Sequence, residues 1–220
     1  MGTIELQDDI LLIRSHIITY GNAAGISITE RIRNEIELMW NEPEALVHLN
    51  DKLHLVKFQI TADYQPGIDD MEILENTDPR NNYFRIEEFC KINISFVDGL
   101  GCNTGYFKLS DLYEGSTTAA HEYGHTLGLN HPHDLDIRGT GTPGIMYPRG
   151  TLVDPQYQYN PGAIPGDNTN GGTMHPQYRK VRLQDILDLR LQRLEFHHKK
   201  SIVGDFSSVW HPDHKDIAEA

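Results

Sequence analysis

The chain has 220 residues, of which 38% are apolar, and a formal net charge of −13. This length and apolar fraction fit one packed domain, or two small lobes around one cleft. The strong negative charge argues against binding to nucleic acid or to an anionic membrane surface.

The N-terminal part predicts a strand followed by a helix. Residues 8–21 (DDILLIRSHIITYG) are rich in Ile and Leu and end at Gly21, which predicts a strand. Residues 27–40 predict a helix that begins with a capping box of Ser27 and Glu30. Its apolar stripe comprises Ile28, Ile32, Ile36 and Met39 or Trp40.

Further strands are expected before residue 110. Residues 53–64 alternate between a set containing Val56, Phe58 and Ile60 and a set containing Lys57 and Gln59, which predicts a strand. Residues 83–89, 92–97 and 105–110 are three more strand candidates. A strand, a helix and then several strands predict a mixed α/β sheet.

The second half predicts two helices that flank an irregular segment. Residues 115–129 predict a helix with Ser116 as its N-cap. Residues 132–180 are dense in Gly, Pro, Asn, Asp and Tyr, which is typical of a functional or poorly ordered loop region. Helical spacing returns over 181–196, and the polar residues from 197 onward predict a loosely attached tail.

The stretch AAHEYGHTLGLNHPHD, residues 119–134, contains histidines at spacings of four and six. On a helix, His121 and His125 present their rings on one face, one turn apart. Gly128 can take a positive φ and end the helix, so that the chain returns His131 to the same ion. Three nitrogen ligands favour zinc, and a fourth position left for water is typical of a catalytic site.

Glu122 directly follows the first of these histidines. A carboxylate at this place can reach a water at the metal, act as general base and pass the proton to a leaving amine. The alternative, a chance group of surface histidines, is weaker because the histidines, the glutamate and the glycine must all coincide.

Residues 121–131 match the extended zinc motif of the metzincin metallopeptidases, and Met146 in GIMYPRG follows where that family has its methionine turn. The resemblance implies that Met146 forms an apolar floor beneath a single catalytic zinc; ordinary core packing is the alternative. Met146-Tyr147-Pro148 and the Asp-Ile pair within 183–189 resemble the matrixins. Pro132 is more similar to the serralysins.

The resemblance implies an α+β (mixed α/β) fold with two lobes in a single catalytic domain. An upper lobe, about 1–131, would hold a twisted five-stranded sheet with helices, and a substrate peptide would extend along the edge strand. A small irregular lower lobe, about 132–196, would carry the final helix, followed by a polar tail over about 197–220. No residues for the second, structural zinc of the vertebrate matrixins are found.

The implied function is that of a zinc-dependent endopeptidase acting on proteins or peptides. One alternative is a protease toxin or effector domain, released from a larger secreted polypeptide and acting on a specific target protein. Another is a non-catalytic zinc-binding module, against which the intact Glu122 argues. The family implies a secreted or exported protein, although the chain shows neither a signal peptide nor a stretch long enough for membrane insertion.

Tyr147, Tyr157 and Tyr159 are candidates for a substrate pocket or for stabilising an oxyanion, and packing within their own loop is the alternative. A calcium ion or second metal at residues 133–136 is weaker than a solvated loop there, and the same holds for residues 211–214.

Cys90 and Cys102 either form a disulfide across a short loop or remain two buried thiols.

Overall fold

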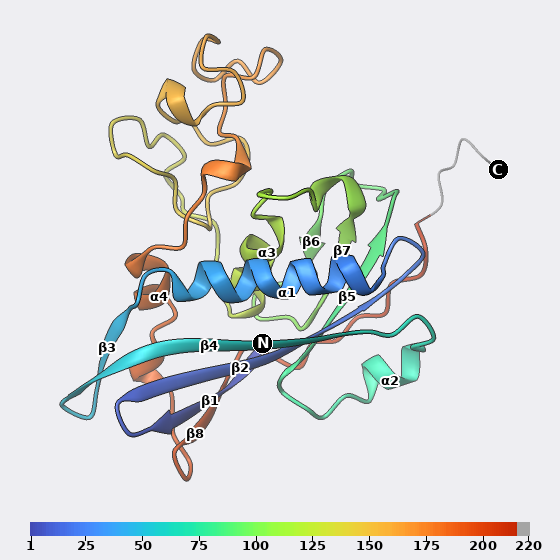
Figure 1. The fold of residues 1–220 in the computed structure, drawn as a ribbon, viewed down its shortest axis with the longest axis vertical. Coiled ribbons are helices and arrows are strands. Elements are labelled where there is room, and N and C mark those ends of the chain that lie inside the picture. The colour runs from blue at the N-terminus through green and yellow to red at the C-terminus, as the bar shows by residue number, and fades with distance from the viewer. Residues whose placement is uncertain (215–220) are drawn as a thin grey trace.

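A computed structural model describes residues 1–214 and shows a curled mixed sheet with one long helix across it (Figure 1). The α-helices are α1 (Ile26–Asn41), α2 (Asp70–Leu74), α3 (Thr118–Thr126) and α4 (Leu183–Asp188). The strands are β1 (Gly2–Gln7), β2 (Ile10–Tyr20), β3 (Leu46–Leu49), β4 (Lys52–Tyr64), β5 (Asn81–Glu87), β6 (Phe96–Val97), β7 (Thr104–Lys108) and β8 (Lys200–Val203). The mixed α/β class expected from the sequence is confirmed.

The main path of the sheet has the order β3-β4-β2-β5-β7-β6, and β1 and β8 extend it from β2. Strand β2 is parallel to β4 and β5, whereas β6 runs antiparallel to β7 at the edge of the sheet. Along one side of β2, residues 10–14 pair with β1 and residues 16–20 pair with β5. The expectation of five strands was therefore wrong within the described residues, where the sheet has eight.

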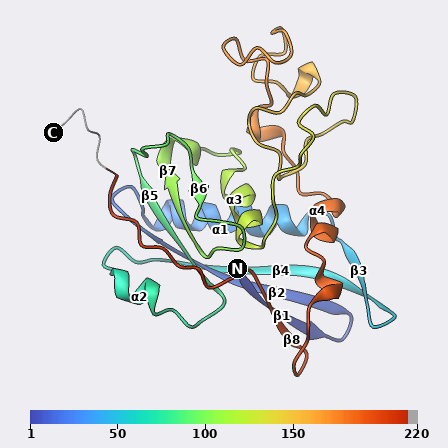
Figure 2. The same cartoon turned by 180° about the vertical axis from the view of Figure 1, so that it is seen from behind.

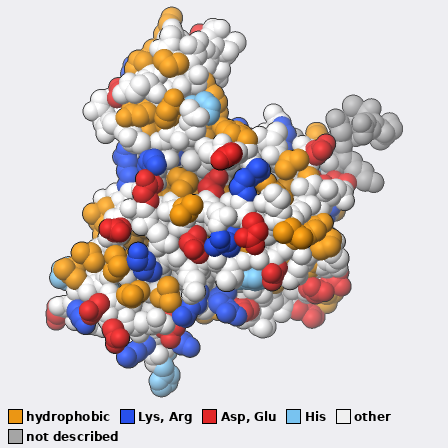
Figure 3. Space-filling view, in the orientation of Figure 1, with side chains coloured by type: hydrophobic (Ala, Val, Ile, Leu, Met, Phe, Trp, Pro, Cys, Tyr) orange, Lys and Arg blue, Asp and Glu red, His pale blue; other side chains and the backbone are white. Residues whose placement is uncertain are grey.

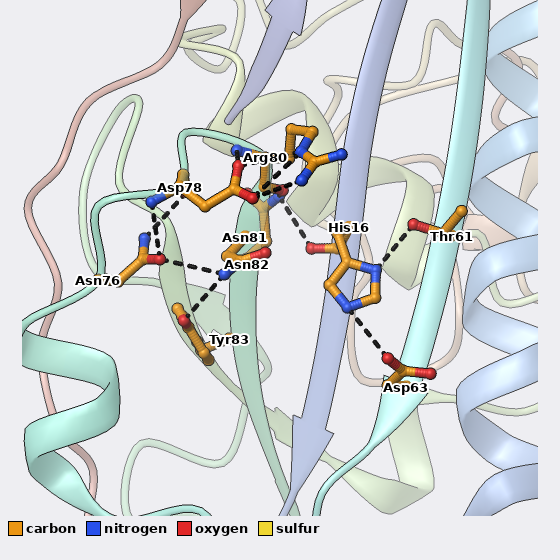
Figure 4. Close-up of polar contacts among 9 residues, drawn as sticks. All are labelled: His16, Thr61, Asp63, Asn76, Asp78, Arg80, Asn81, Asn82 and Tyr83. Atoms are coloured by element: carbon orange, nitrogen blue, oxygen red, sulfur yellow. Dashed lines mark hydrogen bonds and ion pairs between the residues drawn. The ribbon is translucent and has the colours of Figure 1, made fainter.

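Buried polar side chains connect the start of β5 to β2 (Figure 4). The Asn82 side chain is fully buried, and its Nδ2 donates to the backbone oxygens of Arg80, at 2.8 Å, and His16, at 3.4 Å. The backbone N–H of His16 donates to the same Arg80 oxygen at 2.7 Å. Because strands β2 and β5 are joined only through a long connection, these bonds help to fix where their pairing begins.

The α1 stripe packs against the sheet as expected, with Ile28, Ile32, Ile36 and Trp40 buried in the main core. The predicted capping box is wrong. The helix begins at Ile26 with Gly25 at the N-cap and no side-chain cap hydrogen bond, so Ser27 already lies inside the first turn. Burial of the apolar face therefore defines this helix more than its cap does.

The segment after residue 196 is not a loose tail. Strand β8 pairs with β1, and the chain then runs across the back of β5 and β7 (Figure 2). There the Asp205 N–H donates to the Gly101 oxygen at 2.7 Å, and His211 Nε2 bonds Asp98 Oδ1 at 2.7 Å. His211 and His214 are thus half-buried against the sheet while Asp213 is exposed to solvent, and residues 215–220 of the predicted tail lie outside the described residues.

The predicted final helix is shorter than its periodicity indicates. Helix α4 ends at Asp188, Arg190 takes a left-handed conformation with φ 51°, and one 3-10 turn follows at Leu191–Arg193. Ile186, Leu189 and Leu191 are still buried in the main core. The apolar periodicity therefore predicts correctly which residues are buried, but it does not predict where the helix ends.

Residues 132–180 are largely irregular, as expected, and much of this segment projects beyond α3 and α4 (Figures 1 and 2). The projection has its own apolar cluster of Ile137, Val153 and Met174, against which Tyr147 and Tyr157 pack. Within the described residues, Cys90 and Cys102 are buried free thiols. No helix described by the structure is long and apolar enough to cross a membrane.

Candidate metal centre

Helix α3 carries the central histidines and is held from below by α1 and β2. Trp40 Nε1 donates to the Ala120 oxygen at 3.0 Å, and the Ala120 N–H donates to Glu35 Oε1 at 3.1 Å. The Tyr123 hydroxyl shares a 2.8 Å hydrogen bond with Ser15 Oγ. These buried contacts fix both the rotation of α3 about its axis and its distance from α1 and β2. A precisely placed site requires such a fixed helix.

The start of α3 differs from the predicted cap. Thr117, not Ser116, occupies the N-cap, and its hydroxyl makes no capping bond. It donates instead to the Pro176 oxygen at 2.8 Å and accepts from Arg179 Nε at 3.0 Å. The hydroxyl therefore ties the irregular segment to the helix, while Glu35 accepts a hydrogen bond from the first turn of the helix.

The turn after α3 forms as the sequence predicts. Gly128 has φ 95°, its N–H donates to the His125 oxygen at 3.0 Å, and the Leu129 N–H donates to the Gly124 oxygen at 3.0 Å. This ending resembles the glycine-closed helix termini that satisfy the last carbonyl groups. It reverses the chain and brings His131 back to the face of the helix.

The three histidines converge through their Nε2 atoms. His131 Nε2 lies 3.1 Å from the Nε2 atoms of both His121 and His125. The Nδ1 atoms of His121 and His125 lie 2.7 Å from the backbone oxygens of Ile145 and Leu129. An Nδ1–H donating to each carbonyl leaves the Nε2 lone pairs free, so the trio fits a metal that prefers nitrogen ligands.

Burial keeps these imidazoles neutral, which is the form that binds a metal. It lowers the pKa of His125 to about 4, and it places the pKa of His121 well below its usual value. The more exposed His131 is shifted in the same direction by burial, followed by the charge of Arg179.

Glu122 is 6% exposed and lies in the same cavity as the three histidines. Burial raises its pKa to about 8, while the positive charge of Arg179 and the backbone N–H of Val97 act in the opposite direction. A pKa raised toward the working pH suits a carboxyl group that takes up a proton and returns it within one reaction cycle.

Met146 lies beneath the helix, 3% exposed, and packs into the main core. Its side chain lies directly against Gly124, between His121 and His125, where a Cβ atom would overlap the methionine sulfur. This contact is compatible with an apolar floor, and it gives a physical reason for a glycine inside the helix.

Replacing Gly124 by Ala is expected to destabilise the protein by about 1 kcal/mol. Overpacking costs about 1–3 kcal/mol, which outweighs the gain in helix propensity of up to about 1 kcal/mol. Urea unfolding of the single variant, of Met146→Ala and of the double variant measures the coupling. A single Gly124→Ala variant more stable than the wild type would contradict the close contact.

A cavity of about 390 Å³ opens at this centre. Its lining includes the edge segment 94–97, the three histidines, Glu122, and Pro148, Arg149 and Arg179 from the irregular segment. In the space-filling view, the surface is hollowed between the projecting segment and the rest of the molecule, and charged side chains gather there (Figure 3). The predicted edge strand thus borders the candidate site.

The predicted tyrosines do not line this cavity in the described structure. Tyr147 and Tyr157 pack in the cluster within the projection, and Tyr159 lies 4.4 Å, centroid to centroid, from the ring of His175. The alternative of loop packing therefore describes their positions.

Three charged residues of the cavity were missed by sequence reasoning: Asp111, Arg149 and Arg179. Arg149 Nη2 lies 3.0 Å from Asp111 Oδ1, and Asp111 Oδ2 accepts from the N–H and hydroxyl of Ser95, both at 3.0 Å. Arg149 lies within the GIMYPRG stretch and Asp111 shortly before the histidine motif, whereas Arg179 is distant in the sequence, and none of the three was singled out by its residue pattern.

The loop after His131 forms no second metal site among the described residues. Within them, His121, His125 and His131 are the one cluster of potential metal ligands. The Asp136 carboxylate pairs with Arg138, and the Asp134 Oδ1 atom accepts from the Asp136 N–H at 3.0 Å. These contacts are ordinary turn chemistry on an exposed loop.

No protein-family model and no curated protein matches the sequence. The fold is similar to the crystal structure of archaemetzincin from Methanopyrus kandleri, with 11% sequence identity and a TM-score of 0.40. The match covers 81% of this chain and 95% of that chain. The likeness is weak, so the function of this chain has to be inferred from its own residues.

Proposed function

We propose that the protein is a zinc-dependent endopeptidase of the metzincin type. The observation that carries the proposal is the convergence of three histidine Nε2 atoms next to a buried carboxylate, in a cavity bordered by a sheet edge. A metal-binding trio, a base and an edge strand are the three parts that peptide hydrolysis requires.

The residues fit the metal that the motif implies. His121, His125 and His131 would hold the ion through Nε2, with backbone carbonyls orienting the first two rings. When bound, zinc supplies a Lewis acid that polarises the substrate carbonyl and lowers the pKa of water.

The rest of the chemistry belongs to the chain itself. Glu122 takes a proton from the attacking water and returns it to the amine that leaves. Strand β6 pairs with β7 on one side only among the described residues, so its outer edge is available to the backbone of an extended peptide. Met146 supports the helix from beneath without contacting the substrate.

The finer assignments are part of this proposal and extend the sequence resemblance. They comprise the matrixin-like methionine turn and export from the cell, whereas an effector domain released from a larger secreted polypeptide is the alternative to this proposal. None of them alters the chemistry proposed for the histidines and Glu122.

Incubation of the zinc-loaded protein with a diverse peptide library, with fragments identified by mass spectrometry, tests the proposal. Internal cleavage is expected, with loss of activity on chelation and recovery on zinc addition. A Glu122→Gln preparation purified in parallel controls for contaminating proteases. Intact peptides after incubation with fully zinc-loaded, folded protein would refute the proposed activity.

A further inference from the structure

The side chain of Arg179 is an unusual feature of the cavity wall. The residue is 3% exposed, and it forms no ion pair with any described residue. Its Nε donates to Thr117 Oγ1 at 3.0 Å, and its Nη1 donates to the Tyr147 oxygen at 3.2 Å. Both acceptors are neutral, so neither bond balances the charge of the guanidinium, although the carboxyls of Glu122 and Glu35 lie near enough to oppose the lowering of its pKa by burial.

The remaining nitrogen, Nη2, donates to no described residue. It is also not fully enclosed by the protein, because it is absent from the buried polar atoms that have no hydrogen-bond partner. Because Arg179 lines the cavity, this nitrogen is the part of the side chain that a ligand can reach. The hydrogen bonds of Nε and Nη1 hold the guanidinium in one orientation, and Nη2 remains free to donate. The side chain is therefore preorganised to bind an anion.

The acidic residues nearby form no direct ion pair with Arg179. Asp111 is paired with Arg149 and bonded to Ser95. Glu122 and Glu35 act on the pKa of Arg179 through their charges, but neither carboxyl is bonded to its guanidinium within 4.0 Å, and the proposed function requires Glu122 as the base. A buried charge is costly unless it is paired directly, so a guanidinium without a direct ion pair suits an anion that arrives with the substrate.

We propose that this cavity binds a carboxylate of the substrate through Arg179. This inference rests on the proposed peptidase function and names its substrate class. The carboxylate comes either from an Asp or Glu side chain beside the scissile bond or from the free C-terminus of a short peptide. The planar guanidinium fork matches both sources equally well.

Matched peptides distinguish the two sources. Once the cleaved position is known from the library, peptides with Glu or Gln at each flanking position, and with a free or amidated C-terminus, are compared by kcat/KM. We expect about a tenfold to hundredfold preference for the peptide that carries the recognised carboxylate. A preference that follows Glu identifies a side-chain site, and one that follows the free C-terminus identifies an end-directed site. Equal rates for all of these peptides would overturn the proposal.

Variants then assign the preference to a residue. Arg179→Gln should abolish the preference while zinc content stays unchanged, and Arg179→Lys should retain part of it because the charge remains without the fork. Arg138→Gln, an exposed arginine of the same irregular segment, is the control and should behave as wild type. An equal loss for all peptides in Arg179→Gln would instead assign the arginine to general catalysis or structure. If that variant does not fold, wild-type selectivity and Arg179→Lys still decide the matter.

A binding measurement separates this inference from the proposed activity. Glu122→Gln protein, zinc-loaded and unable to use its base, is titrated with the same peptides by calorimetry. Tighter binding of the carboxylate peptide, lost on adding Arg179→Gln, supports the site even if no peptide is cleaved by the wild type. Equal affinity for all peptides overturns the site and leaves the peptidase proposal standing.

Discussion

Replacing Glu122 by Gln is expected to lower kcat/KM for peptide hydrolysis by about a hundredfold to ten-thousandfold, the usual contribution of a positioned general base. The amide keeps the size of the side chain and can still orient a water, but it cannot take its proton. Because Glu122 is adjacent to the histidine trio without belonging to it, zinc content should remain one ion per chain.

Steady-state kinetics and elemental analysis of the same preparations check this result. Glu114→Gln is the matched control, since Glu114 is exposed in the loop that leads into α3. Loss of zinc in Glu122→Gln would make this residue a ligand or a structural support. Unchanged hydrolysis would mean that another group activates the water.

His131→Ala is expected to weaken zinc binding by more than about a hundredfold, because even residues that only orient a ligand contribute about tenfold to a hundredfold. The two remaining imidazoles on α3 form an incomplete site, so hydrolysis should be lost together with the metal. Since His131 lies after the helix has ended, the fold should persist, with unchanged far-UV circular dichroism.

Competition with a chromophoric zinc chelator measures this loss of affinity. His133→Ala is the matched control, because His133 is an exposed histidine two residues further along the same loop and lies outside the trio. Full zinc occupancy in His131→Ala would exclude His131 as a ligand. An equal loss of affinity in both variants would indicate disruption of the loop instead of removal of one ligand.

The parts of the centre that depend on local spacing could be predicted from the sequence. A spacing of four from His121 to His125 fixes their rings on one helical face, and Gly128 ends that helix with a positive φ. The apolar stripe of α1 and the strands β2 and β4 were predicted for the same reason, because each periodicity spans one element.

The parts that depend on contacts between distant segments could not be predicted. Strand β8 is four residues long and is defined by its pairing with β1, which lies at the opposite end of the sequence. Arg179 enters the cavity because Thr117, 62 residues away, binds its Nε atom. No local sequence pattern indicates such a contact, and the sequence does not distinguish a buried arginine from an exposed one.

The same limit applies at element ends and in the loop. Thr117 occupies the N-cap position of α3, but its hydroxyl donates to the Pro176 oxygen instead of capping the helix, and Ser116 Oγ accepts from the Thr118 N–H at 3.3 Å. The sequence left pocket lining and loop packing open for the tyrosines, and the rings of Tyr147 and Tyr157 pack within the projection. Caps and loop side chains are decided by tertiary neighbours, which the sequence does not show.

Zinc K-edge X-ray absorption of the purified, zinc-loaded protein tests the central claim most directly. The account predicts one zinc per chain with three imidazole nitrogens and one oxygen at about 2.0–2.1 Å, and no sulfur ligand. A sulfur shell at about 2.3 Å would place the ion at Cys90 or Cys102. That result, or the absence of specifically bound zinc, would contradict the proposed metal centre.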